Sequence, residues 1–163
     1  MEQVITKITH CPNIALVTLP EIPSDSRIAA EILTAISDAG VNVDMISQTA
    51  PQGSTISLAF SISMDSMALL LPVINSLKPL HPGLKCEISG GMNKINFYDA
   101  NMVNTPGVAA RVFSALAASS VQVVMITTST VDISILVRDH EIEEALALCS
   151  RTFGTESEEV PFE

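Results

Sequence analysis

An internal repeat constrains the fold of this chain more than any other feature of its sequence. Residues 28–49, IAAEILTAISDAGVNVDMISQT, recur as residues 108–129, VAARVFSALAASSVQVVMITTS, at a constant offset of 80 positions and without a gap. Met45 and Met125 are one of several identical pairs, and most other pairs exchange one apolar residue for another. A unit of about 80 residues exceeds the roughly 20–50 residues of a solenoid repeat. It has the size of a small domain, so the sequence predicts two similar domains.

The composition supplies a packed core and excludes several classes of partner. Of the 163 residues 47% are apolar, 4% are aromatic and none is tryptophan, so aliphatic side chains must fill the interior. The net charge is −10 with eight lysines and arginines in total, which argues against nucleic-acid binding. The longest apolar run, residues 67–73, is far shorter than a membrane span. The chain start lacks a secretory signal pattern, and three widely spaced cysteines indicate a reduced cytoplasmic protein.

Hydrophobic periodicity predicts the same order of elements in both copies. Residues 20–26 are expected to form a loop in which Ser24, Asp25 or Ser26 caps the next helix, and Asp139 is the cap candidate of the last helix. Pro72 lies near the middle of its predicted helix and should kink or shorten it. Gly90-Gly91 should link the two copies. The acidic tail should be partly a loop and partly a frayed end. The expected strands are 2–9, 13–19, 41–48, 55–62, 84–89, 92–98, 121–127 and 131–137. The first expected helix follows the loop 20–26 and ends near residue 39, and the other three span 66–77, 106–118 and 140–152.

This order predicts an α+β fold of two ferredoxin-like βαββαβ units, each an antiparallel sheet with both helices on one face. The first copy has a strand after its second helix, whereas the second copy has only the acidic tail there, and strand 2–9 is left over. We therefore predict that strand 2–9 completes the second unit. The first unit, residues 11–90, would then be inserted into the second, residues 91–163 plus strand 2–9, with a pseudo-twofold between them.

Apolar residues on the predicted strands indicate a homodimer. Ile46, Val124 and Ile126 fall on the strand face opposite Met45 and Met125. Helices cover only one face of such a sheet, so apolar side chains on the other face need another sheet or chain.

The repeated segments resemble the ACT domains at the C-terminus of aspartate kinases. The second copy reads TPGVAARVF…VQVVMITTS…ISILV, where the family has TPG-[VI]-AAR-x-F, then INIQMISTSE and a strand beginning ISV. The first copy reads VNVDMISQ, where the family has INVDMIVQN. The resemblance covers about residues 2–152, and the kinase catalytic portion with its KFGGTS-type motif is absent. The chain departs from the family where residues 21–27 replace a DRPG-type turn, where Gln122 replaces Asn, and where Thr130 replaces an acidic residue.

The resemblance implies a non-catalytic regulatory protein that needs no cofactor and binds a free amino acid, threonine first and lysine second. An effector carboxylate needs donors such as the N–H groups of a helix start, and its ammonium needs carbonyl, carboxamide or carboxylate oxygens. The site should lie between the two kinds of unit, and a kinase catalytic subunit is a possible partner. The candidate effector residues are Glu21, Ser24, Asp25, Ser26, Arg27, Ile28, Asn42, Val43, Asp44, Gln48, Asn104, Thr105, Gly107, Val108, Ala109, Gln122 and Val123.

Each candidate also has a purely structural interpretation. The loops at the helix starts can serve for ordinary helix capping. Asn42 and Asp44 can belong to a solvated sheet face, and Gln48 can belong to an exposed strand end. The three histidines and three cysteines lack paired metal-ligand spacing, and no nucleophile has a recognisable partner motif, so we expect neither a metal site nor catalytic residues. Three functions remain open: an allosteric regulatory subunit of an aspartate kinase, an autonomous amino-acid sensor, and an oligomerisation module with a degenerate site.

Overall fold

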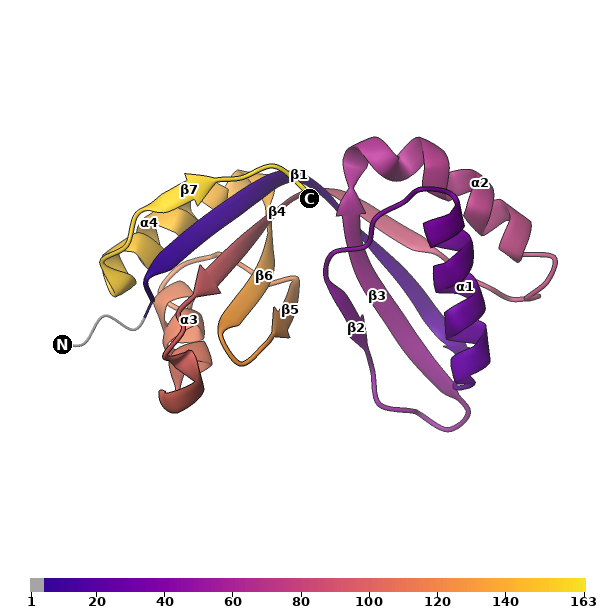
Figure 1. Cartoon of the computed structure of the whole chain (residues 1–163), viewed down its shortest axis with the longest axis horizontal. Coiled ribbons are helices and arrows are strands. Elements are labelled where there is room, and N and C mark those ends of the chain that lie inside the picture. The colour runs from indigo at the N-terminus through magenta and orange to yellow at the C-terminus, as the bar shows by residue number, and fades with distance from the viewer. Residues whose placement is uncertain (1–4) are drawn as a thin grey trace. The chain divides into compact units, whose positions relative to one another are not determined.

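A computed structural model describes residues 5–163, which form two compact units (Figure 1). The first unit comprises Asn13–Gly90 together with Glu163, and the second comprises the chain up to Pro12 and Gly91–Phe162. The strands are β1 (Lys7–Pro23), β2 (Ile46–Gln48), β3 (Thr55–Ser63), β4 (Glu87–Tyr98), β5 (Met125–Thr128), β6 (Asp132–Arg138) and β7 (Ser157–Glu159), and the α-helices are α1 (Ser26–Asp38), α2 (Met67–Leu77), α3 (Val108–Leu116) and α4 (Ile142–Phe153).

In the first unit, β1 pairs antiparallel with β3, which pairs antiparallel with β2. Alternate residues of β3, from Ile56 to Ile62, are buried against both helices, which lie beside each other on that face of the sheet. The helices bury Ile32 and Ile36 from α1, and Leu70, Ile74 and Leu77 from α2. The core of this unit is therefore aliphatic apart from Phe60.

In the second unit, the strand order is β1-β4-β6-β5, and β6 runs antiparallel to both of its neighbours, β4 and β5. Ile133, Ile135 and Val137 of β6 share a buried face with α3 and α4. Ile5 and Ile8 belong to the same core, and β7 adds to the edge of β1 as a parallel strand. The α+β fold with one sheet face covered by helices is confirmed in both units.

Two long strands pass from one unit to the other. β1 does so at Asn13 and β4 at Gly91, and both residues have left-handed backbone, with φ of 64° and 69°. Asparagine and glycine tolerate this conformation best, so each strand absorbs an irregularity without ending. The separate strands expected at 2–9 and 13–19, and at 84–89 and 92–98, are therefore wrong. Gly90-Gly91 does link the two copies as expected, but within a continuous strand. The part of the expected strand 2–9 at residues 2–4 lies outside the described residues.

Other boundaries also differ from the prediction. The expected loop 20–26 is strand as far as Pro23, because a register shift between Leu19 and Ile22 lets β1 continue. Strands 41–48 and 121–127 shorten to β2 and β5, and α2 runs through Pro72 to Leu77 rather than ending early. Asp139 lies in a short 3-10 turn, the N-cap of α4 is Glu141, and part of the acidic tail forms β7.

Candidate functional site

The start of α1 is capped by its own side chains. Asp25 is the N-cap, and its Oδ1 accepts a hydrogen bond from the backbone N–H of Arg27 at 2.9 Å. The Arg27 guanidinium folds back onto the same carboxylate, with Nη2 at 2.7 Å from Oδ2, and this lowers the pKa of Asp25 below its ordinary value. Ser24 donates its backbone N–H to Ser54, and Ser26 opens the helix. A carboxylate of the protein thus already caps a helix start that the sequence offered as a donor group for an effector carboxylate.

The candidates on and before β2 are spread along its exposed edge. Asn42, Asp44 and Gln48 are exposed, whereas Val43 is half-buried and packs against the core of the first unit. The Asn42 carboxamide donates to the backbone oxygen of Glu163 at 2.5 Å. This pattern bears out the predicted alternation of inward and outward side chains before β2.

The start of α3 differs from that of α1, although the two helices belong to the repeat. Its N-cap is Gly107, with a left-handed φ of 90° and no side-chain hydrogen bond to the helix start. The first N–H groups of a helix have no partner within it, and together with the helix dipole they favour an anion. A pocket of about 340 Å³ lies at this helix start. Among the residues that line it are four candidates, Thr105, Gly107, Val108 and Ala109.

A second wall of this pocket was predicted only at Thr130, one of the positions where the chain departs from the family pattern. It consists of Thr128, Ser129 and Thr130, in the turn between β5 and β6, with Met102 and Ile133 as apolar neighbours. Ser129 Oγ donates to Asp132 Oδ2 at 2.7 Å and accepts two backbone N–H groups, so the turn has a fixed shape. The run of hydroxyl residues between two predicted strands is the sequence signal that could have identified this wall.

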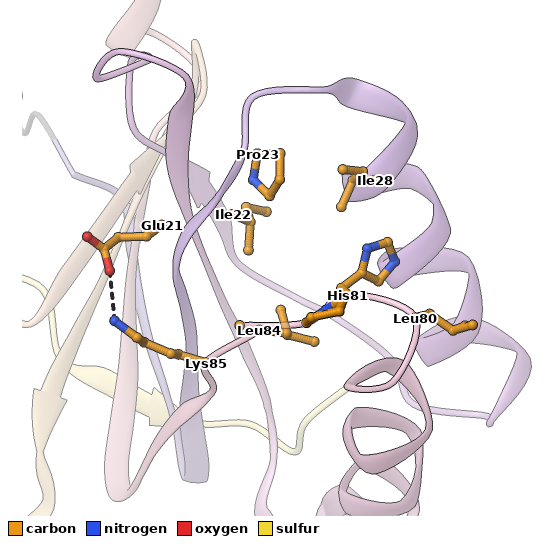
Figure 2. Close-up of a pocket in the computed structure, with 10 residues that line it drawn as sticks. Glu21, Ile22, Pro23, Ile28, Leu80, His81, Leu84 and Lys85 are labelled. Carbon is orange, nitrogen blue, oxygen red and sulfur yellow. Dashed lines mark hydrogen bonds and ion pairs between the residues drawn. The ribbon is translucent and has the colours of Figure 1, made fainter.

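Two further candidates, Glu21 and Ile28, line a different pocket, in the first unit. It has a volume of about 420 Å³ and lies between the end of β1, the first turn of α1 and the segment 80–85 that leads into β4 (Figure 2). Lys85 Nζ lies 2.8 Å from Glu21 Oε2. None of residues 80–85 was among the predicted effector residues.

Comparison with known proteins shows which family the chain resembles. Residues 95–153 match the ACT domain model. The chain is 30% identical over 160 residues to the aspartokinase of Geobacillus stearothermophilus, a match that covers 97% of this chain and 38% of that protein. It also aligns with the ligand-free regulatory subunit of aspartate kinase from Thermus thermophilus, with a TM-score of 0.84, at 27% identity, over 92% of this chain and 99% of that chain.

The chain corresponds to the ACT-domain regulatory region of aspartate kinases. A structure of aspartokinase alpha and beta subunits matches this regulatory region at 25% identity, with a TM-score of 0.82, over 92% of this chain and 99% of that chain. The region spans 38% of the length of the curated relative from Geobacillus, so only the regulatory part of such a kinase is present in this sequence. The family resemblance that the repeated motifs predicted is confirmed.

In this regulatory region, the remaining candidates of the second copy lie outside the α3 pocket. Asn104 is exposed and ends a short 3-10 turn, and Val123 packs against the core of the second unit. The backbone N–H of Gln122 donates to Glu141 Oε1 at 3.2 Å, and its side-chain Oε1 accepts from Arg138 Nη1 at 3.4 Å. Sequence reasoning missed Glu141, a carboxylate only 8% exposed that also accepts the N–H of Arg138.

The described part of the chain offers neither a metal-ligand cluster nor a membrane-spanning helix. Residues 5–163 contain no group of three or more His, Cys, Asp or Glu side chains arranged to hold a metal ion. None of the described helices combines the length and apolar character needed to cross a membrane. The three cysteines form no disulfide within the described residues, and burial raises the pKa of the Cys149 thiol to about 11.

Proposed function

We propose that this chain is the effector-binding regulatory part of an aspartate kinase, without chemistry of its own, and that it binds free threonine or, second, lysine. The match to aspartate kinase regulatory subunits over nearly the whole chain supports the regulatory role. The choice of amino acid rests on the resemblance of the repeated motifs to that family. Threonine and lysine share the α-carboxylate and α-ammonium that any such site must recognise.

The observation that carries this proposal is the uncapped start of α3. Its N–H groups face a pocket, and Gly107 places no side chain in front of them. These donors suit a carboxylate. The hydroxyl groups of Thr105, Thr128 and Thr130 on the lining are suitable acceptors for an ammonium or partners for a threonine hydroxyl. By resemblance, loop 21–28, Asn42 and Gln48 of the first unit contribute to effector binding as well.

Calorimetric titration of the whole chain with threonine and with lysine tests this proposal. Thr105→Val keeps the shape of the side chain but removes the hydroxyl, which now donates to the Asn101 carbonyl at 3.1 Å. Loss of one buried hydrogen-bond partner costs about 1–3 kcal/mol, so affinity should fall by roughly 5–150-fold. Thr152→Val is the matched control, because the exposed Thr152 hydroxyl likewise donates to a carbonyl four residues earlier, at 2.9 Å.

Three outcomes distinguish effector binding at the α3 pocket, effector binding elsewhere and no effector binding. A loss of affinity in Thr105→Val but not in Thr152→Val supports the α3 site. Equal affinity in both variants, with Asn42→Ala and Gln48→Ala also silent, would show that the effector binds elsewhere. If neither amino acid binds at millimolar concentration, the oligomerisation module becomes the better explanation.

The repeat provides a gain-of-function test. Asp25-Ser26-Arg27 of the first copy aligns with Thr105-Pro106-Gly107 of the second. Replacing the first triplet by Thr-Pro-Gly removes the Asp25 carboxylate and its Arg27 partner from the start of α1. If an open helix start is what admits a carboxylate, this variant should bind additional effector. An unchanged stoichiometry would mean that the open start of α3 is not sufficient for binding.

Regulation requires that the effector bind one state of the kinase better than another. Mixing the chain with a kinase catalytic subunit should therefore change effector affinity, by about 5–150-fold for a coupling of 1–3 kcal/mol. Equal affinity with and without that partner would favour the autonomous sensor. We place this function in the cytoplasm. We also propose that the first unit, residues 11–90, is inserted into the second, which comprises residues 91–163 and the part of β1 that precedes the insertion.

We also propose that the chain forms a homodimer. Ile46 on β2 is 44% exposed, and it lies on a strand whose other edge is unoccupied within the first unit. Of the three residues predicted on the uncovered face, Ile126 packs instead against the core of the second unit, so the dimer proposal rests mainly on Ile46. Light scattering should give twice the chain mass at micromolar concentration, and Ile46→Asp should shift the mass toward the monomer. A monomer mass for the unmodified chain would refute this proposal.

A further inference from the structure

A buried carboxylate lies at the end of β4, just before the segment that lines one side of the α3 pocket. Asp99 directly follows Tyr98, the last residue of β4, and it is only 2% exposed. It is not one of the residues that line the pocket. Burial of a carboxylate is costly unless hydrogen bonds compensate for the lost water. The hydrogen bonds of Asp99 therefore indicate what this residue contributes.

The side chain and the backbone of Asp99 fix the turn on one side of the pocket. Its Oδ1 accepts the backbone N–H of Asn101 at 2.6 Å, and its carbonyl accepts the N–H of Met102 at 3.1 Å. The Asn101 carbonyl in turn accepts the hydroxyl of Thr105 at 3.1 Å. Met102, Val103 and Thr105 belong to the pocket lining, so this turn determines where they lie.

The backbone of Asp99 also reaches the second side of the pocket. Its N–H donates to the carbonyl of Val131 at 3.0 Å. The N–H of Val131 donates to Ser129 Oγ at 3.2 Å, and Ser129 lies on the lining between Thr128 and Thr130. One buried residue thus connects the two segments, 102–105 and 128–130, that line the pocket.

The repeat shows the same position without a carboxylate. At the offset of 80, Asp99 corresponds to Leu19 of the first copy, which is fully buried. There β1 continues beyond a register shift to Pro23, whereas β4 ends at Tyr98 and a turn follows. An aspartate that accepts the N–H two residues later favours a turn, and leucine has no oxygen with which to do so. The carboxylate therefore accounts for a turn that only the second copy has at this point.

We propose that Asp99 is a positioning residue of the α3 pocket. It does not contact the effector, but it holds segments 102–105 and 128–130 in the arrangement that the effector needs. This inference rests on the effector site proposed at α3. Hydrogen bonds to a ligand tolerate only small displacements of donor and acceptor. A turn that loses the Asp99 carboxylate should therefore bind the effector more weakly, even while the second unit stays folded.

Calorimetric titration of threonine and of lysine into the full chain and three variants tests this role. Asp99→Asn keeps an oxygen that can accept the Asn101 N–H, so its affinity should stay within about threefold of that of the unmodified chain. Asp99→Leu introduces the residue of the first copy, and Asp99→Ala removes the acceptor. Both should weaken binding about tenfold. Recovery of affinity in the asparagine variant is a result that loss of packing alone would not give.

A control variant separates positioning from a general loss of stability. Val137→Ala removes methyl groups from a fully buried position of β6, outside the pocket lining. It should lower the denaturant midpoint but leave effector affinity unchanged at temperatures where the protein is folded. Amide hydrogen exchange without ligand should show that residues 101 and 102 lose protection in Asp99→Leu and keep it in Val137→Ala.

Four results would overturn the inference. Asp99→Leu and Asp99→Ala may bind with the affinity of the unmodified chain, which would show that the turn does not need the carboxylate. Asp99→Asn may lose as much affinity as Asp99→Ala, which would point to the charge rather than to the turn. Val137→Ala may lose as much as Asp99→Leu, which would point to stability. If the unmodified chain binds neither amino acid, the effector site itself fails and the role of Asp99 with it, whereas the first three results leave that site intact.

Discussion

Replacing Glu141 by alanine should destabilise the second unit, because this carboxylate holds two backbone N–H groups. Oε1 accepts the N–H of Gln122 at 3.2 Å, and Oε2 accepts the N–H of Arg138 at 3.3 Å. Glu141 is only 8% exposed, so water does not readily replace it. The contacts tie the segment before β5 and the end of β6 to the start of α4.

The expected loss follows from the number and length of these bonds. A hydrogen bond to a charged group contributes about 1.5–3 kcal/mol, and both distances are at the long end of the N–H···O range. Two such bonds therefore indicate a loss of about 2–3 kcal/mol for Glu141→Ala. For a chain of this size, each kcal/mol lowers the melting temperature by roughly 2–4 °C, so we expect a decrease of roughly 4–12 °C.

Denaturant unfolding and amide hydrogen exchange are the assays. Glu144→Ala is the matched control, since Glu144 lies exposed in the first turn of the same helix and should change stability by no more than about 0.5 kcal/mol. Glu141→Gln keeps one acceptor oxygen and should fall between the two. The reasoning fails if Glu141→Ala matches Glu144→Ala, or if the amides of Gln122 and Arg138 keep their protection.

Three further predictions concern packing and pH. Gly90→Ala should be nearly neutral, because the end of the Met64 side chain, whose Sδ would lie 2.7 Å from the new Cβ, can rotate away. Gly91→Ala should cost about 1–2 kcal/mol, because Gly91 has a left-handed φ of 69°. Denaturant midpoints in the reverse order would contradict this prediction. Ile36→Ala, at a fully buried position of α1, should cost about 2–5 kcal/mol in urea unfolding, and the exposed Thr34→Ala about 0.5 or less. Burial raises the pKa of the Cys149 thiol from 9.0 to about 11, so the folded state holds its proton more tightly, and stability should fall by about 2–3 kcal/mol as pH rises through that interval. Cys149→Ala should remove this fall, and an equal fall in both proteins would disprove the assignment.

The fold could be predicted from the repeat because both copies carry the same local patterns of apolar residues, and these patterns determine secondary structure. Helical spacing of apolar residues before Gly40, and alternation around Met45, depend only on near neighbours. The continuity of β1 and β4 was not predictable in this way. It depends on left-handed backbone at Asn13 and Gly91, and on pairing with residues far along the chain. A turn residue inside a strand therefore appeared as a boundary.

The candidate sites were predicted only as far as local sequence determines them. The segment from Thr105 to Ala109 does form one side of a pocket, because a helix start depends on adjacent residues. The Glu21–Lys85 pair joins residues 64 positions apart, and Glu141 reaches Gln122 across 19. Such contacts arise only when the sheet brings distant segments together, and no periodicity in the sequence reports them.

The two copies differ in how the start of one equivalent helix, α1 or α3, is capped. In each unit a helix follows the first strand, and its start has N–H groups that need acceptors. In the second copy Gly107 leaves them open to a pocket, whereas in the first copy Asp25 and Arg27 satisfy the start of α1 internally. A ligand carboxylate at α1 would have to displace a carboxylate of the protein, which is a fixed part of the fold. These substitutions make the two helix starts different in chemistry, because an anion at α1 would have to displace the Asp25 carboxylate, whereas Gly107 places no side chain at the start of α3.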